Sequence, residues 1–268
     1  MPSAPSPAAS EPLPPEAPPP SVRPTLGTRL WFAWAVLVAL VVTVPLSLLQ
    51  VVTHAFDPTA RNFKRWAGLW GRMILRGSGI RVTVEGALPD PARPCVFVAN
   101  HQNALDVPVL AGYLPAPFGF VAKAELARVP FLGFAIRQSA SLFIDRSEPR
   151  RSLASIQRAG ERIRGGNSVL IFPEGRRTWS GRLDAFMKGA FILAVEAGVP
   201  LVPVTLVDAY RLLDERHGAA RPGRVHVVLG TPIDLAGKRR RDVLALMAAV
   251  REEMERTLAA RNSADAVV

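Results

Sequence analysis

The sequence has a single cysteine, Cys95, and four histidines: His54, His101, His217 and His226. One thiol cannot form a disulfide within the chain, which suits a reducing compartment, and its place inside an apolar run predicts core packing. The histidines follow no metal-ligand spacing, so neither a zinc site nor any other metal is expected. Acidic residues are also in the minority, 22 against 33 lysines and arginines, which gives a net charge of +11. A disulfide-rich secreted domain and a zinc protein are both disfavoured.

Charge is missing from one long stretch near the start of the chain. No charged side chain occurs from Leu30 to Thr53, and this run opens with Leu-Trp-Phe-Ala-Trp. It exceeds the ~20 residues that cross a hydrocarbon core, and tryptophan favours the edge of a bilayer. Pro45 inside the run allows a re-entrant or monotopic insertion in place of a full crossing. We predict a membrane segment at residues 30–54, since no cleavage site of a signal peptide closes the run.

Large apolar residues are scarce before this segment. Residues 1–25 consist mainly of Pro, Ala and Ser, a composition that cannot bury a core, so a disordered tail is predicted over residues 1–29.

A basic stretch follows the membrane segment and contains no acidic residue. Its cations are Arg61, Lys64, Arg65, Arg72 and Arg76, and apolar residues recur between them at three- and four-residue steps. This pattern predicts an amphipathic helix at residues 61–79 that lies on an anionic membrane surface. An ordinary helix packed on the domain is the alternative. The positive-inside tendency places residues 61 onward on the cytoplasmic face, at the cell inner membrane.

Most of the charge lies beyond residue 60, where 31 of the 33 basic and 19 of the 22 acidic residues are found. The positive electrostatic potential of this region attracts anionic partners: phospholipid head groups, nucleic acid or an acidic carrier protein.

The rest of the chain, residues 80–261, alternates between strand and helix patterns. The strand-like runs are Ile80–Val84, Cys95–Ala99, Phe118–Ala122, Ser141–Asp145, Ser168–Phe172, Leu201–Val207 and Val225–Leu229. Helical patterns lie at Ala104–Leu114, Pro149–Arg164, Phe186–Ala197 and Arg239 to about Arg261. The alternation predicts an α/β domain with a mixed, largely parallel sheet of about seven strands flanked by helices, preceded by the membrane and amphipathic helices.

The run Cys95–Ala99 ends in Asn-His-Gln-Asn-Ala-Leu-Asp, which places His101 and Asp106 five positions apart. A turn between strand and helix can fold this aspartate back onto the imidazole. A carboxylate on one ring nitrogen fixes the tautomer and leaves the other nitrogen as a general base. The alternative is that Asp106 is a helix N-cap before Val107-Pro108 and that His101 is a polar loop residue.

Three other strands also end in polar residues. Lys123 follows one run, Asp145-Arg146 a second, and Pro173-Glu174-Gly175-Arg176-Arg177 a third. If these strands are neighbours, their cations meet His101 at one edge of the sheet. Arginine matches the geometry of phosphate, so the edge predicts a phosphate-bearing substrate with a hydroxyl near the His/Asp pair.

Four ordered blocks resemble the glycerolipid acyltransferases, and most closely the bacterial 1-acyl-glycerol-3-phosphate acyltransferases of the phosphate acyltransferase superfamily. The blocks are His101-x4-Asp106, Phe143-Ile144-Asp145-Arg146, Phe172-Pro173-Glu174-Gly175 and Val199-Pro200-Leu201-Val202-Pro203-Val204. Two positions depart from the family pattern: Ala140 stands for a glycine, and Arg176 for a threonine.

The resemblance implies the roles of these residues. His101 and Asp106 are the catalytic pair, while Glu174, Gly175, Arg177, Arg146 and Lys123 bind substrate. The acceptor is a lysophospholipid, expected to be lysophosphatidic acid, and the donor is acyl-CoA or acyl carrier protein, with no cofactor and no nucleic acid partner. The fourth block shapes an acyl groove. Three alternatives remain: another acceptor such as lyso-ornithine lipid, a thioesterase, or a non-catalytic membrane-binding protein.

Overall fold

The computed structural model describes residues 21–86, 90, 93–114, 116–123, 141–144, 160–161, 163 and 166–265. The helices are α1 (Leu26–Phe56), α2 (Ala60–Gly77), α3 (Asp106–Tyr113), α6 (Lys188–Ala197) and α7 (Val243–Asp265), with short 3-10 turns η2 (Ala209–Arg211) and η3 (Arg240–Asp242). The strands are β1 (Ile80–Glu85), β2 (Val96–Ala99), β3 (Phe118–Lys123), β4 (Leu142–Ile144), β5 (Ser168–Ile171), β6 (Leu201–Val207), β7 (Leu213–Asp214), β8 (Ala219–Ala220) and β9 (Gly223–Leu229).

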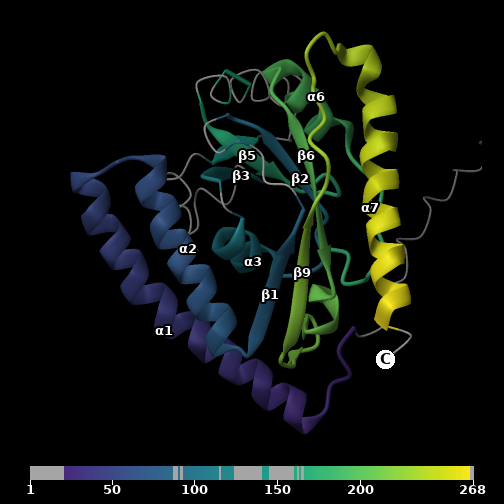
Figure 1. The fold of residues 1–268 in the computed structure, drawn as a ribbon. Coiled ribbons are helices and arrows are strands. Elements are labelled where there is room, and N and C mark those ends of the chain that lie inside the picture. Colours follow the sequence, from purple (N-terminus) through teal and green to yellow (C-terminus); the bar gives the residue numbers. More distant parts are fainter. Residues whose placement is uncertain are drawn as a thin grey trace, which may run out of the picture.

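The main sheet has seven strands in the order β1-β9-β6-β2-β5-β3-β4 (Figure 1), which confirms the predicted mixed α/β class. β6 and β9 pair antiparallel, and the other neighbours in this order pair parallel. The strands β2, β5, β3 and β4 are consecutive, so their carboxyl ends lie along one edge. This is the adjacency that the prediction about polar strand ends required.

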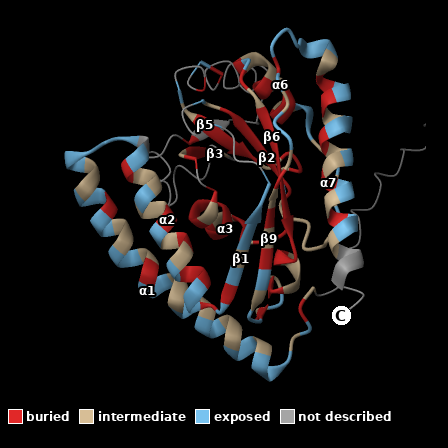
Figure 2. Cartoon of the chain, in the orientation of Figure 1, coloured by how far each residue is buried: buried red, intermediate tan, exposed pale blue. Residues whose placement is uncertain are grey.

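Alternate residues of the central strands pack into two separate hydrophobic cores, one on each face of the sheet. In β2, Phe97 and Ala99 belong to a core that includes residues of α2 and α3, while Val96 and Val98 belong to one that includes α6 and α7. This follows from the period of two along a strand. Helices therefore cover both faces of the sheet, and its central strands are buried throughout (Figure 2).

The helices α1 and α2 form a hairpin beside the domain (Figure 1). α1 has 31 residues and is the one described helix long and apolar enough to cross a membrane, judged by length and composition alone. Its first turns are anchored on the domain, since Trp31 and Phe32 pack against the core and the Trp31 indole N–H donates to Ser78 O at 3.2 Å.

The predicted disordered tail at residues 1–29 is wrong for its last part. Ser21 N donates to the Asp214 carboxylate at 3.0 Å, Val22 is buried, and α1 already begins at Leu26 behind a Thr25 capping box. Long-range contacts that the local composition does not encode order this segment. Residues 1–20 lie outside the described part of the chain, as does most of the predicted helix at 149–164.

Candidate active site

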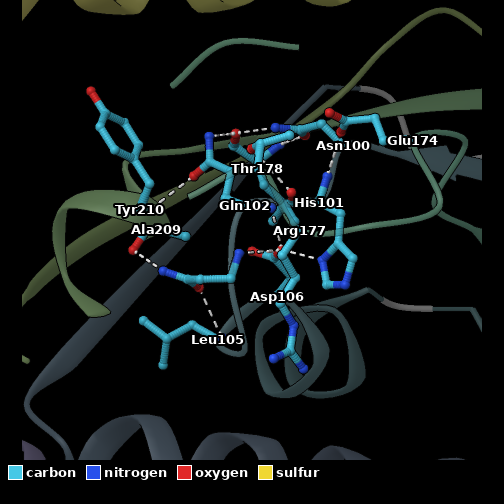
Figure 3. Close-up of polar contacts among 12 residues, drawn as sticks. Asn100, His101, Gln102, Leu105, Asp106, Glu174, Arg177, Thr178, Ala209 and Tyr210 are labelled. Atoms are coloured by element: carbon cyan, nitrogen blue, oxygen red, sulfur yellow. Dashed lines mark hydrogen bonds and ion pairs between the residues drawn. The ribbon is translucent and has the colours of Figure 1, made fainter. Parts of the chain in front are cut away.

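The turn after β2 brings His101 and Asp106 into contact. His101 Nδ1 lies 2.7 Å from Asp106 Oδ2, which also accepts the backbone N–H groups of Gln102 at 2.6 Å and Asn103 at 3.0 Å (Figure 3). Three donors on one oxygen fix the carboxylate relative to the ring. The contact predicted from the spacing is present, and its catalytic role remains a prediction.

Asp106 is the first residue of α3, and the N-cap is Leu105, which makes no side-chain cap. The N-cap alternative is therefore wrong, because the carboxylate turns back toward the preceding loop. Asp106 is fully buried, which raises its pKa, while the hydrogen bonds from His101 and from the two backbone N–H groups act in the opposite direction. Its position at a helix amino end also favours the ionised form.

The His101 ring stacks on Phe172, with ring centroids 4.0 Å apart and planes 15° apart. Because Asp106 takes Nδ1, the Nε2 atom is the ring nitrogen left for a substrate, and it contacts no hydrogen-bonding group in the described residues. The ring is thus held both at its face and at one nitrogen, as a positioned base requires.

Buried amides around the pair fix the loop to the end of the neighbouring strand β6 and to the segment that follows it. The Asn100 side chain donates to Leu206 O at 3.0 Å and accepts Leu206 N at 2.7 Å. Gln102 reaches the segment after β6 and accepts Tyr210 N at 3.0 Å (Figure 3). Asn103 reaches the same segment and donates to Ala209 O at 2.7 Å. The sequence reasoning named none of these three as functional, although they are polar residues directly around His101.

Glu174 joins the loop after β5 to the His101 turn. One carboxylate oxygen accepts His101 N at 2.8 Å, and the other accepts Asp184 N at 2.7 Å. Burial raises the pKa of Glu174, and these two N–H groups oppose the shift. Gly175 follows with φ +69°, a conformation that favours glycine, and lines the cavity described below. Both positions were predicted to bind substrate, and for Glu174 the contacts present are to backbone.

A cavity of about 930 Å³ opens at His101 and extends along the α1–α2 hairpin. Its polar end is lined by His101, Gly175, Arg177 and Glu215, and its apolar part by side chains of α1 and α2 such as Ala39, Trp66, Ala67 and Trp70. Val199–Val204, predicted to shape an acyl groove, does not line this cavity, because Leu201–Val204 belong to the buried strand β6.

The lysine and arginine residues predicted to meet at the carboxyl ends of the strands have different surroundings. Arg177 lines the cavity and pairs with Glu215, with Nη1 3.0 Å from Oε1. Arg176 pairs instead with Asp184, its Nε 2.7 Å from Oδ2, and does not line the cavity. Lys123 ends β3, two strands from β2, and its side chain is not described. Arg146 lies outside the described residues.

Glu215 is the cavity residue that sequence reasoning missed. It sits in the turn between β7 and β8, far from all four motif blocks, and no local pattern marks it. In the described residues no cluster of three or more metal-ligating side chains is found.

A family model described as Acyltransferase matches residues 80–207. A 1-acyl-sn-glycerol-3-phosphate acyltransferase of Chlamydomonas reinhardtii is 33% identical over 83% of the chain and 68% of the relative. One of Pseudomonas aeruginosa is 34% identical over 69% of the chain and 71% of the relative. The crystal structure of the Thermotoga maritima 1-acyl-sn-glycerophosphate acyltransferase superposes with a TM-score of 0.76 at 25% identity, covering 88% of this chain and 96% of that one. Across four curated relatives the chain spans 60–71% of their length.

Proposed function

The chain belongs to the 1-acyl-sn-glycerol-3-phosphate acyltransferase family, and on that premise we propose that it esterifies the free hydroxyl of lysophosphatidic acid to give phosphatidic acid. The acyl group comes from a thioester, acyl-CoA or acyl carrier protein. The observation that carries the proposal is the 2.7 Å contact between His101 and Asp106, which leaves Nε2 at a cavity that also contains Arg177.

His101 acts as the general base. With Nδ1–H donated to Asp106, Nε2 takes the proton of the acceptor hydroxyl while that oxygen attacks the thioester carbonyl carbon. The imidazolium that forms is stabilised by the buried Asp106 carboxylate. The tetrahedral intermediate collapses with cleavage of the carbon–sulfur bond, and Nε2–H returns the proton to the thiolate. The thioester is already activated, so no protein nucleophile is required.

Arg177 is a cation of the cavity that is placed to read the acceptor phosphate. It lies on the loop after β5, the strand that pairs with β2, and lines the same cavity as His101. A guanidinium forms two parallel hydrogen bonds to phosphate. Lys123, at the end of β3, and Arg146, which follows β4 in the sequence, are further candidates, and Glu174 and Gly175 shape the loop that carries Arg177.

The apolar part of the cavity is proposed to hold an acyl chain. It lies between α1, α2 and α3, and its walls are mainly aliphatic and aromatic side chains. A chain in this space points its carbonyl end toward His101. The acyl groove is therefore assigned to the N-terminal hairpin and not to the block Val199–Val204, where β6 begins.

Membrane attachment is proposed through α1, which inserts without crossing. The face of α1 away from the domain exposes large apolar residues, among them Leu40 at 59% and Val44 at 59%. Both ends of the hairpin return to the domain, through Trp31 on α1 and through the packing of α2 on α3. A hairpin whose two ends return to one domain fits a monotopic arrangement on the cytoplasmic face, with the catalytic domain on the same side of the bilayer.

The experiment offers the purified protein labelled acyl-CoA, or acyl carrier protein, with a panel of lyso-lipids. Labelled phosphatidic acid formed only with lysophosphatidic acid is the expected product. Acylated ornithine lipid as the preferred product would overturn the acceptor, and acyl-CoA hydrolysis that is independent of any acceptor would identify a thioesterase.

A further inference from the structure

The residue proposed to bind the acceptor phosphate already has a partner within the protein. Arg177 Nη1 lies 3.0 Å from Glu215 Oε1, and both side chains line the cavity that His101 faces. The Arg177 side chain is 40% exposed and that of Glu215 20%. A phosphate that approaches Arg177 therefore meets a carboxylate on the same guanidinium.

Glu215 is held at this place by a fixed turn. The preceding residue, Asp214, is fully buried and accepts Arg216 Nη2 at 2.8 Å and Ser21 N at 3.0 Å. Arg216 also lies over the Trp179 ring, 4.7 Å from its centroid, on the loop that carries Arg177. Because the turn is braced on both sides, the Glu215 carboxylate is presented to Arg177 by the fold.

The Arg177–Glu215 pair is incompletely satisfied. The second carboxylate oxygen, Oε2, is buried and makes no hydrogen bond to any described residue. A buried carboxylate oxygen without a donor has lost water and gained nothing in return, which weakens the pair. Release of Glu215 from Arg177 would let that oxygen regain water, so an exchange of partners on the guanidinium is favoured.

We propose that Glu215 is a placeholder for the acceptor phosphate: it pairs with Arg177 when no phosphomonoester is bound and is displaced when one binds. The inference rests on the proposed function, since it assumes that Arg177 reads the phosphate. Lysophosphatidic acid and phosphatidic acid both carry this group, so Glu215 competes with substrate and product alike. Its consequence is weaker binding of both, which hastens release of the product.

The test compares Glu215→Gln with the wild type, with Asp184→Asn as the matched control. Asp184 is paired with Arg176, the neighbour of Arg177, but lies outside the cavity. A partly exposed ion pair of this kind changes affinity by about 1.5- to fivefold. Glu215→Gln should lower the KM for lysophosphatidic acid and the inhibition constant of phosphatidic acid by that factor, and Asp184→Asn should leave both unchanged.

The decisive comparison repeats Glu215→Gln in the Arg177→Ala background. Competition for Arg177 predicts that the gain disappears there, whereas a general repulsion by Glu215 predicts the same gain in both backgrounds and overturns the proposal. Weaker or unchanged binding in Glu215→Gln also overturns it, because Glu215 would then orient Arg177 or do nothing to it.

Binding is measured as well as turnover, with labelled lysophosphatidic acid and His101→Ala protein that cannot consume it. Circular dichroism and thermal unfolding of each variant identify any that fails to fold, and Glu215→Asp, which keeps the charge, should retain wild-type affinity. Wild type that binds lysophosphatidic acid but does not acylate it would overturn the proposed function and leave the Glu215 comparison valid. Absence of binding to every variant would overturn both.

Discussion

Lys64 on α2 donates its Nζ to the carbonyl oxygen of Ala111, 2.7 Å away, near the end of α3. Arg72 likewise donates to Gly112 O at 2.9 Å. Two cations of α2 thus satisfy carbonyl groups at the carboxyl end of the helix whose first residue is Asp106, where positive charge is favoured. Part of the basic face predicted to lie on the bilayer therefore packs on the domain, as the alternative interpretation of this helix required.

Lys64 should make stability depend on pH. Burial, and secondarily the charge of Arg72, lowers the pKa of Lys64 from 10.5 to about 8. Between these pH values the unfolded lysine holds a proton that the folded one has released, so stability rises with pH, by up to ~3 kcal/mol. Chemical unfolding from pH 7 to 10.5 should show this rise in the wild type and a flatter profile in Lys64→Met. Parallel profiles would contradict the assignment.

Substitution of His101 and of Asp106 should reduce turnover to different extents. His101→Ala should abolish turnover, because it removes the group proposed to take the proton from the acceptor hydroxyl. Asp106→Asn should lower kcat by roughly 10³–10⁴-fold, since it removes the charge behind the imidazolium. The turnover of both variants is measured as initial rates at saturating acyl-CoA. Comparable acyl transfer by His101→Ala would exclude it as the base, whereas loss of folding in Asp106→Asn would assign the carboxylate to the structure of the turn.

The His101–Asp106 contact and most strands of the sheet could be predicted from the sequence for the same physical reason, because both depend on residues that are close together in the chain. His101 and Asp106 are close in the chain, and each strand is an apolar run closed by polar residues. Pairings across loops carry no such signal. Arg177 meets Glu215 across 38 residues, and β1 pairs with β9, so neither contact follows from any local pattern. Whether the Val199–Val204 block lines a groove could not be predicted, because an apolar run has the same pattern in a buried strand and in the wall of a groove.

Charges on the outer face of α1 should release the protein from membranes. Leu40→Glu with Val44→Glu places two carboxylates on the face proposed to insert, where each costs a few kcal/mol in hydrocarbon. Sedimentation with anionic vesicles should show most of the variant unbound. Leu244→Glu is the matched control, because Leu244 is equally exposed at 60% but lies on α7, on the opposite face of the sheet. Retained binding of the double variant would place the attachment elsewhere.

Filling the apolar cavity should shorten the acyl chains that the enzyme accepts. Ala39 on α1 lines this space, and Ala39→Phe occupies room that the proposal gives to the chain. Losing contact with two methylene groups costs ~1.6 kcal/mol, so kcat/KM for a long-chain acyl-CoA should fall by about 15-fold. A medium-chain donor should be affected little. Equal losses with both donors would show that the chain lies elsewhere.

Arg177 gives the sharpest test of phosphate recognition. A charge-assisted hydrogen bond to phosphate is worth ~1.5–3 kcal/mol, so Arg177→Ala should lower kcat/KM for lysophosphatidic acid by roughly 10- to 150-fold. Arg177→Lys should recover only part of this, because lysine keeps the charge and loses the planar fork. Hydrolysis of acyl-CoA without an acceptor should stay nearly unchanged, which separates phosphate binding from damage to His101.

Arg176→Thr is the control for Arg177, because Arg176 is bound to Asp184 outside the cavity. Threonine is the residue that the family pattern has at this position, so turnover of lysophosphatidic acid should be retained. The readout is kcat/KM across the panel of lyso-lipids, measured beside Arg177→Ala. If Arg176→Thr improved lysophosphatidic acid and removed activity on another lyso-lipid, Arg176 would select the head group, and lysophosphatidic acid would not be the natural acceptor.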